Sequence, residues 1–408
     1  MGQTVVGVGH PLARKLYSTA LFAETIRKNG FRSKLTGAAP KQKGAEAKAK
    51  GQTPSGYPFV RVTDLSKTAG ETISVDLFNI IQGKPVMGDK KLSGKMMSLT
   101  SSSQDISINQ CRGGVDPGGR MTQQRTLHNL RSMSLANLAG WNHRLEDQMC
   151  LVHAAGARGF DAGEDWVVPL ESDPDFAEIA VNTVLPPTRN RRFFAGAVTT
   201  ASGMANTDNL ALEDIDRLRA AIDDMVFPMQ SVQMEGDMEA EENPLFVLYV
   251  SSRQWNDIQT NTSDTVWRTV LANAHARSNG FKHPLFMGTP GYWNGILIKK
   301  LWRPIRFNPG DTVREYDASD VIQDVTVSAG VTIDRALLFG AQALACVYGR
   351  HQKSDTYYNW HEEESDHGNT VEVSTASMGG KAKLRFTGTN GEITDHGVCT
   401  LDTHVSTP

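Results

Sequence analysis

Residues 122–155, TQQRTLHNLRSMSLANLAGWNHRLEDQMCLVHAA, carry the strongest pattern in the chain. Apolar or small side chains recur every three or four residues, which is the spacing of one face of an α-helix. These positions are Leu127, Leu130, Ser134, Leu138, Trp141, Leu145, Met149 and Val152. At 1.5 Å per residue the helix would be a rod of roughly 50 Å, long enough to be the backbone of a domain. Gly140 costs about 1 kcal/mol relative to alanine inside a helix, which leaves open whether the rod is unbroken.

Two alternating segments upstream of this helix predict the strands of a long hairpin. Residues 72–80, TISVDLFNI, and residues 104–110, QDISINQ, place apolar side chains at every second position. The stretch between them, QGKPVMGDKKLSGKMMSLTSSS, is polar and broken by glycine, so the hairpin should project with its tip exposed. Because a lone hairpin is marginally stable in water, we expect it to become ordered by lying on another subunit.

The N-terminal region is strongly basic. Residues 1–61 hold eleven basic and two acidic side chains, a net charge of +9, although the whole chain has a net charge of -3. Residues 11–29 predict a short amphipathic helix that ends at Gly30. Residues 36–58, rich in Gly, Ala, Lys and Pro, predict an extended arm that binds a neighbouring copy or a polyanion, or is a solvated basic linker. We expect that residues 31–60 and 81–103 are not packed in the interior of their own subunit.

Helices and strands alternate in the rest of the chain. Residues 212–225 and 266–275 have helical periodicity, and residues 245–250 form a short apolar run typical of a buried strand. Residues 295–302 and 335–345 are apolar enough to be buried, and two β-prone segments follow at 371–375 and 381–387. The sequence therefore predicts an α+β body.

Two segments resemble motifs for nucleotide or metal binding, but each lacks a residue that the motif requires. The loop GGVDPGGR at 113–120 has the glycine spacing of a phosphate-binding loop, but Arg120 and Met121 replace its Lys and Ser/Thr. We expect a turn between the hairpin and the long helix there. In the segment HEEESDH, 361–367, Ser365 stands where a zinc-protease helix needs its second histidine. Three readings of this segment stay open. It is a divalent-ion site, the site of a metal-dependent hydrolase, or an acidic face that is solvated or pairs with the basic arm of another subunit.

The cysteine spacing and the hydropathy of the chain indicate the cellular compartment in which the protein is expected. Cys111, Cys150, Cys346 and Cys399 have no CxxC spacing, which indicates buried thiols in a reducing compartment and neither a disulfide framework nor a zinc site. No apolar run reaches the roughly 18–20 residues that cross a bilayer. The N-terminus also lacks the apolar core of a signal peptide, so we expect no membrane partner and a product that stays in the cytoplasm.

The order of these segments resembles the major capsid protein family of podophages that inject a giant virion RNA polymerase. The resemblance covers most of the chain and rests on several blocks in the same order. They are LARKLYSTALFAETIRKNGFRSKLTG, VTDLSKTAGETISVDLFN with the tip GDKKLSGK, ISINQCRGGVDPGGRMTQQRTLHNLRSMSLANLAGWNHRLEDQ, HPLFMGTPGYWNGILIKKLWRP, RALLFGAQALACVYG and NWHEEESDHGNTVEVSTASMGGKAKLRF.

The resemblance implies the α+β Hong Kong 97-type capsid fold and a division of the chain into five parts. They are an N-terminal arm at 1–62, an extended loop at 63–113, a peripheral domain at 114–200 with a spine helix at 122–155, a mainly axial domain at 201–330, and a return to the peripheral domain with C-terminal strands at 331–408.

The implied function is that of a coat protein without catalytic activity or cofactor. Its copies would form pentamers and hexamers of an icosahedral shell around phage double-stranded DNA, assembled in the cytoplasm of a bacterial host and retained in the virion. The implied partners are copies of itself, a separate scaffolding protein and a portal, with nonspecific contact to packaged DNA. A decoration protein stays open. An encapsulin-like compartment that encloses cargo enzymes is the alternative reading.

Lysines are the candidate contact residues between subunits. Four lie on the arm, at Lys41, Lys43, Lys48 and Lys50, and four on the extended loop, at Lys84, Lys90, Lys91 and Lys95. Some capsids of this fold weld their subunits through a lysine of that loop. Exposed lysine is also ordinary surface chemistry, so a covalent cross-link and a plain charged surface both stay open.

Overall fold

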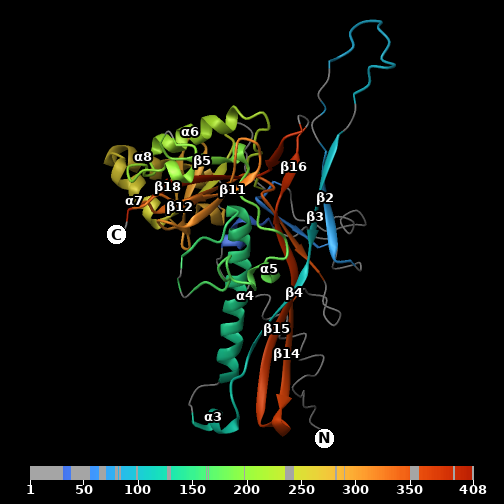
Figure 1. The fold of residues 1–408 in the computed structure, drawn as a ribbon, viewed down its shortest axis with the longest axis vertical. Coiled ribbons are helices and arrows are strands. Elements are labelled where there is room, and N and C mark those ends of the chain that lie inside the picture. Colours follow the sequence, from blue (N-terminus) through green and yellow to red (C-terminus); the bar gives the residue numbers. More distant parts are fainter. Residues whose placement is uncertain are drawn as a thin grey trace.

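The computed structural model describes most of the chain. The described residues are 31–37, 56–63, 70–78, 81, 84–97, 100–125, 130–161, 163, 165–196, 198–234, 243–280, 283–288, 290–349, 358–388 and 391–406. In this part, helix α4 (Leu130–Ala155) and the long strands β14 (Tyr358–Ser365) and β15 (Thr370–Lys383) run away from a wider body of helices and sheet (Figure 1). The molecule is therefore elongated.

Helix α4 confirms the predicted helical face. Ser134, Leu138, Leu145, Met149 and Val152 are buried, and α4 continues through the glycine at position 140. It starts at residue 130, after a short helix α3 (Arg120–Arg125), and residues 126–129 lie outside the described residues. Its 26 residues correspond to about 39 Å. The expected rod of roughly 50 Å also includes residues 126–129, so its full length stays a prediction.

One sheet has five strands and packs along α4. Strand β15 pairs with β14, β13 (Leu344–Tyr348) and β4 (Asn109–Val115), and β1 (Phe59–Val62) adds to β13. The two predicted segments at 371–375 and 381–387 are mostly this one strand of 14 residues. Position 380 lies inside this strand and requires glycine, because a Cβ there would be 2.0 Å from the backbone oxygen of Ser107. The expectation of a turn at 113–120 was also wrong at its start, since residues 113–115 belong to β4.

The second sheet has seven strands and forms the centre of the body. Its order is β5 (Arg192–Phe194), β18 (Val398–His404), β12 (Ile333–Phe339), β6 (Phe246–Ser251), β8 (Ile296–Leu301) and β7 (Gly291–Trp293), with β9 (Ile305–Phe307) paired to β12. All residues of β6, β12 and β18 are buried, as expected for strands covered on both faces. The predicted buried segment at 245–250 is confirmed, and so is 335–345 apart from the half-buried Gln342. The segment at 295–302 is buried only in part, because Lys300 and Trp302 are exposed.

Alternate residues of this sheet face two different apolar clusters. Val247, Tyr249 and Leu337 pack with the C-terminal half of α4. Phe246, Leu248 and Leu338 pack instead with residues of α6 (Leu212–Asp223) and α7 (Ser252–Asn261). The predicted helices at 212–225 and 266–275 are thus confirmed as α6 and as α8 (Asp264–Gly280).

Short elements connect these layers. They are α5 (Phe176–Ile179), the 3₁₀ turns η2 (Arg189–Arg191), η3 (Ala201–Gly203), η4 (Pro284–Phe286) and η5 (Asp366–Gly368), the hairpin β10 (Thr312–Tyr316) with β11 (Ile322–Thr326), and the pair β16 (Arg385–Thr387) with β17 (Ile393–Asp395).

The predicted long hairpin is present. Strands β2 (Thr72–Phe78) and β3 (Ser101–Ser107) pair antiparallel, with Thr72 opposite Ser107 and Phe78 opposite Ser101. The described part of the loop between them reaches beyond the rest of the molecule (Figure 1). Ile73, Val75 and Leu77 pack against a buried cluster from β1, β13 and the end of β15. The base of the hairpin is therefore ordered on its own subunit, contrary to the expectation that it needs a neighbour.

The expectation that residues 31–60 stay out of the interior was wrong at both described ends. Helix α2 (Phe31–Leu35) buries Leu35 completely, and Tyr57 and Phe59 belong to the largest core cluster. The short apolar run at 57–62, YPFVRV, follows the polar arm directly and was the signal for this packing. Residues 38–55 lie outside the described residues.

Candidate assembly surface

The loop between β2 and β3 presents the lysines predicted as subunit contacts. Lys84, Lys90, Lys91 and Lys95 are all exposed, and Asp89 lies among them. The described residues of 84–97 are exposed apart from a partly buried Val86. The sequence therefore placed these four side chains correctly on a projecting surface. Whether they contact a neighbouring copy stays a prediction.

Apolar side chains share this loop. Met87 is 70% exposed, Met96 is 78% exposed, and Leu92 is more than half exposed. Large exposed apolar side chains gathered on one loop favour contact with another protein surface, and the flexible thioether of methionine adapts to varied partners. The charge pattern drew attention to the lysines, while the methionines were the stronger signal for an interface.

Hydrogen bonds hold the base of the loop to the five-stranded sheet and its extension. The Gln104 side chain donates to the Lys383 carbonyl over 3.0 Å and accepts from the Arg385 backbone N–H over 2.8 Å. The Ser102 hydroxyl accepts from the Thr387 N–H over 3.1 Å. The tip is thus carried on an anchored base.

The four arm lysines Lys41, Lys43, Lys48 and Lys50 lie outside the described residues, as does the predicted helix at 11–29. The described segment nearest to them is α2, which is fixed to α4. The backbone N–H groups of Phe31 and Arg32 both donate to the Asp147 carboxylate over 3.2 Å. This contact determines where the N-terminal segment meets the body.

A buried charge cluster joins three distant parts of the chain. Glu146 of α4 accepts from Arg32 over 2.9 Å and from Lys381 of β15 over 2.7 Å, and the Tyr348 hydroxyl donates to it over 3.1 Å. Burial alone would raise the pKa of Glu146, but Lys381 and Arg32 reverse that effect and lower it. Sequence reasoning missed this cluster.

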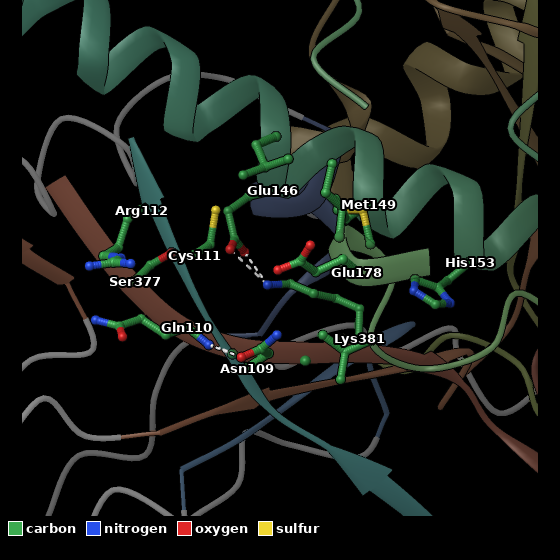
Figure 2. Close-up of a pocket in the computed structure, with 15 residues that line it drawn as sticks. Asn109, Gln110, Cys111, Arg112, Glu146, Met149, His153, Glu178, Ser377 and Lys381 are labelled. Carbon is green, nitrogen blue, oxygen red and sulfur yellow. Dashed lines mark hydrogen bonds and ion pairs between the residues drawn. The ribbon is translucent and has the colours of Figure 1, made fainter. Parts of the chain in front are cut away.

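A cavity of 190 Å³ borders this cluster between α4, α5 and the strands β4 and β15 (Figure 2). Glu146 and Lys381 form part of its wall with Cys111, Glu178 and His153. His153 is buried and its Nε2 has no hydrogen-bond partner. Burial, reinforced by Lys381 and Lys383, lowers its pKa to about 3, so the imidazole is neutral at ordinary pH.

The acidic side chains of segment 361–367 have different surroundings, since some are buried in ion pairs and others are exposed. Glu362 is buried and receives two bonds from Arg131 of α4, over 2.9 and 2.8 Å. Glu363 and Glu364 are exposed on β14. Within the described ranges, no three His, Cys, Asp or Glu side chains are arranged to hold a metal ion.

One apolar side chain of the body is exposed to an unusual degree. Trp302, in the turn between β8 and β9, is 93% exposed. It borders a cavity of 330 Å³ that is also lined by Phe31 and by Asp147 of α4. The neighbouring Arg303 is held by Asp165 over 2.9 Å. An exposed tryptophan beside a cavity is a second candidate contact surface.

No described helix combines the length and the apolar character that a membrane span requires.

Comparisons with known proteins agree with this geometry. The structure is similar to the capsid of Ralstonia phage GP4, with a TM-score of 0.74 and 25% identity over 100% of this chain and 99% of that one. It is also similar in fold to the capsid asymmetric unit of cyanophage Pam1, with a TM-score of 0.60 and 18% identity over 87% of this chain and 90% of that one. The expected Hong Kong 97-type α+β fold is thus confirmed.

The sequence comparisons are consistent with the fold. The major capsid protein of Pseudomonas phage KPP25 is 29% identical over 133 residues, which are 32% of this chain and 35% of that relative. The match therefore spans about a third of the relative's length. The model of the family described as phage capsid protein matches residues 5–407. The chain belongs to the phage capsid protein family.

Proposed function

We propose that this chain is a major capsid protein whose copies assemble into the pentamers and hexamers of an icosahedral shell around phage double-stranded DNA. The observation that carries the proposal is the loop at 84–97. It projects from an anchored hairpin, and it exposes four lysines and the apolar side chains of Met87 and Met96. A subunit that works alone has no use for such a surface, whereas a shell subunit can bury it on a neighbour.

The role we propose is structural rather than catalytic, and it needs no cofactor. The division into arm (1–62), extended loop (63–113), peripheral domain (114–200), axial domain (201–330) and peripheral return (331–408) remains part of the proposal. Strands from the last two parts share the seven-stranded sheet, since β12 and β18 pair with each other and β12 pairs with β6. These two parts would therefore move as one unit.

The partners follow from the resemblance to the podophage family with a giant virion RNA polymerase, which is the subgroup that we propose. They are a separate scaffolding protein, a portal and nonspecific contact with packaged DNA, with a decoration protein as an open option. Assembly would take place in the bacterial cytoplasm and the product would be the virion capsid.

The loop surface is tested by reversing its charge. A variant with Lys84, Lys90, Lys91 and Lys95 all changed to Glu should fold normally, because these side chains are exposed, and should fail to form closed shells when expressed with the scaffold. The matched control changes the same four residues to Arg and should assemble. Electron microscopy gives the shell yield, and calorimetry gives the melting temperature. Shells at the normal yield from the glutamate variant would refute the contact role.

The arm is tested at Lys41, Lys43, Lys48 and Lys50. Their reversal to Glu should weaken assembly, and the defect should depend on salt if the arm meets an acidic surface. The same defect at every salt concentration would contradict a charge contact.

The content of the particles separates phage capsid from the encapsulin-like alternative. Particles from the natural source should contain DNA and a portal vertex. Protein cargo without DNA would favour a cellular compartment instead.

A further inference from the structure

Two cysteine sulfurs lie in contact in the core. The Sγ atoms of Cys150, on α4, and Cys346, on β13, are 3.8 Å apart, and both residues are buried. The two positions are 196 residues apart in sequence. Their spacing in the chain gave no sign of this contact, which arises only because α4 packs along the sheet.

The other two cysteines lack such a partner among the described residues. The sulfur nearest to Cys399 is the thioether of Met229, at 3.9 Å, which cannot form a disulfide. Cys111 lies half-buried on β4, at the wall of the cavity in Figure 2. Only the pair on α4 and β13 is therefore placed for reaction within this part of the chain.

Positive charge lies near the pair, whereas burial disfavours a thiolate at both cysteines. Cys346 stands opposite Lys381 in the ladder of β13 and β15, and Cys150 follows Glu146 by about one helical turn. Lys381 and Arg32 therefore place positive charge near the sulfurs, which stabilises a thiolate. The contact with Cys150 is the main cause of a lowered pKa at Cys346, and the same contact raises the pKa of Cys150.

The cavity in Figure 2 lies near the pair. Its wall includes Glu146 and Lys381, and these are the direct neighbours of the two cysteines on the helix and across the ladder.

We propose that Cys150 and Cys346 form a reversible disulfide inside one subunit when the chain meets an oxidising environment. The sulfurs need to approach from contact distance to about 2.05 Å, which small side-chain rotations and a slight movement of α4 toward β13 supply. The bond would fix the spine helix to the five-stranded sheet. The reaction lies within one chain, so it does not depend on assembly into a shell.

The oxidant is a low-molecular-weight disulfide. The Cys346 thiolate attacks one of its sulfurs, forms a mixed disulfide and releases one small thiolate. The Cys150 thiolate then attacks Cys346 Sγ, closes the protein disulfide and releases the second small thiolate. Two protein thiols are oxidised, one small disulfide is reduced to two thiols, and the two protons pass to these products. A reducing compartment drives the reaction back.

The experiment is a thiol count on the full chain after refolding in oxidised glutathione, where access to the core does not limit the reaction. The protein is quenched in acid, unfolded, alkylated with N-ethylmaleimide and weighed. We expect two alkylated cysteines, compared with four after refolding in dithiothreitol, and a peptide map that joins residues 150 and 346. The oxidised chain should also melt at a higher temperature than the reduced chain, because the bond closes a long loop.

Matched variants separate this pair from the other cysteines. Cys399→Ala should still lose two thiols, leaving one, whereas Cys150→Ala and Cys346→Ala should each keep all three. The peptide map of the wild-type chain identifies the bonded cysteines by itself. The test therefore stands even if a variant folds poorly. Four alkylated cysteines after refolding in oxidised glutathione, or a bond that uses Cys111 or Cys399, would overturn the proposal.

Discussion

Arg32 and Glu146 meet in the interior of the subunit, with the guanidinium Nη1 2.9 Å from the carboxylate Oε2, although 114 residues separate them in sequence. This contact fixes the N-terminal segment to the middle of the spine helix. Lys381 approaches the same carboxylate from β15. One buried anion therefore holds together the start of the body, its longest helix and its longest strand.

Removing that anion should destabilise the subunit. Glu146→Gln leaves Arg32 and Lys381 buried without their counter-charge, and breaking a buried pair in this way costs about 3–5 kcal/mol. Urea denaturation followed by circular dichroism measures the loss in free energy of unfolding. Glu178→Gln is the matched control, because Glu178 borders the same cavity but is exposed, and it should change stability by at most about 0.5 kcal/mol. Equal stability of the two variants would show that the buried charges do not support the fold.

The neutral, buried His153 should make stability fall below neutral pH. Its pKa is lowered to about 3 by burial and by two lysines, whereas an unfolded histidine has a pKa of about 6.5. Between these values the unfolded chain binds a proton that the folded chain does not. Stability is therefore complete above about pH 6.5 and is lost as the pH falls, by up to about 1.4 kcal/mol per pH unit.

Unfolding measured between pH 7 and pH 5 tests this dependence, because Glu146 and Asp395, whose pKa values are both lowered, lose their effect only at lower pH. His153→Gln should reduce the slope of unfolding free energy against pH by about one proton. His275→Gln, at an exposed position on α8, should leave the slope unchanged. A His153 variant with the wild-type slope would mean that this imidazole is protonated in the folded state.

Local patterns could be read from the sequence, and pairings between distant segments could not. The period of α4 and the alternation of β2 and β3 depend on neighbouring residues, so the end of α4 at Ala155 and the start of β2 at Thr72 were predicted correctly. The strand predicted at 104–110 instead overlaps the end of β3 and the start of β4. The glycines at 379 and 380 looked like a break between two strands. They belong instead to one strand that the backbone of Ser107 approaches closely, and such a close approach is a property of the folded chain.

Of the candidate site, the exposed loop was predicted from the sequence and the buried charge cluster was not. The loop lysines were identified because an exposed tip needs only a polar, glycine-broken sequence. The charge cluster around Glu146 was missed because its members come from α2, α4 and β15, and no local pattern joins them. Lys381 and Lys383 are buried at the end of β15, and buried lysines require buried acids. Lys383 indeed pairs with Asp395 over 2.8 Å.

The anchor of the hairpin should depend on one amide side chain. Gln104→Ala removes the bonds to the backbone of Lys383 and Arg385 and should weaken local order by about 1–3 kcal/mol. Hydrogen exchange at the amides of β2 and β3 should become faster, while α4 keeps its protection. Ser103→Ala, at an exposed neighbouring position, is the control and should exchange like the wild type. Unchanged exchange in Gln104→Ala would assign the anchoring to the remaining contacts, which include the apolar packing of Ile73 and Val75 and the bond from Thr387 to Ser102.

Trp302 should matter for assembly but not for folding. Its side chain is 93% exposed, so Trp302→Ser should change the free energy of unfolding of the monomer by at most about 0.5 kcal/mol. Tryptophan buried at the centre of an interface often contributes 2 kcal/mol or more, roughly a thirtyfold change in an association constant. We therefore expect the variant to fold normally and to give far fewer shells, measured by sedimentation after expression with the scaffold. Val226→Ser changes another exposed apolar side chain, distant from Trp302 in the sequence. It controls for a general loss of apolar surface. A normal shell yield from Trp302→Ser would remove Trp302 from the set of subunit contacts and leave the 84–97 loop and the arm as the proposed contact surfaces.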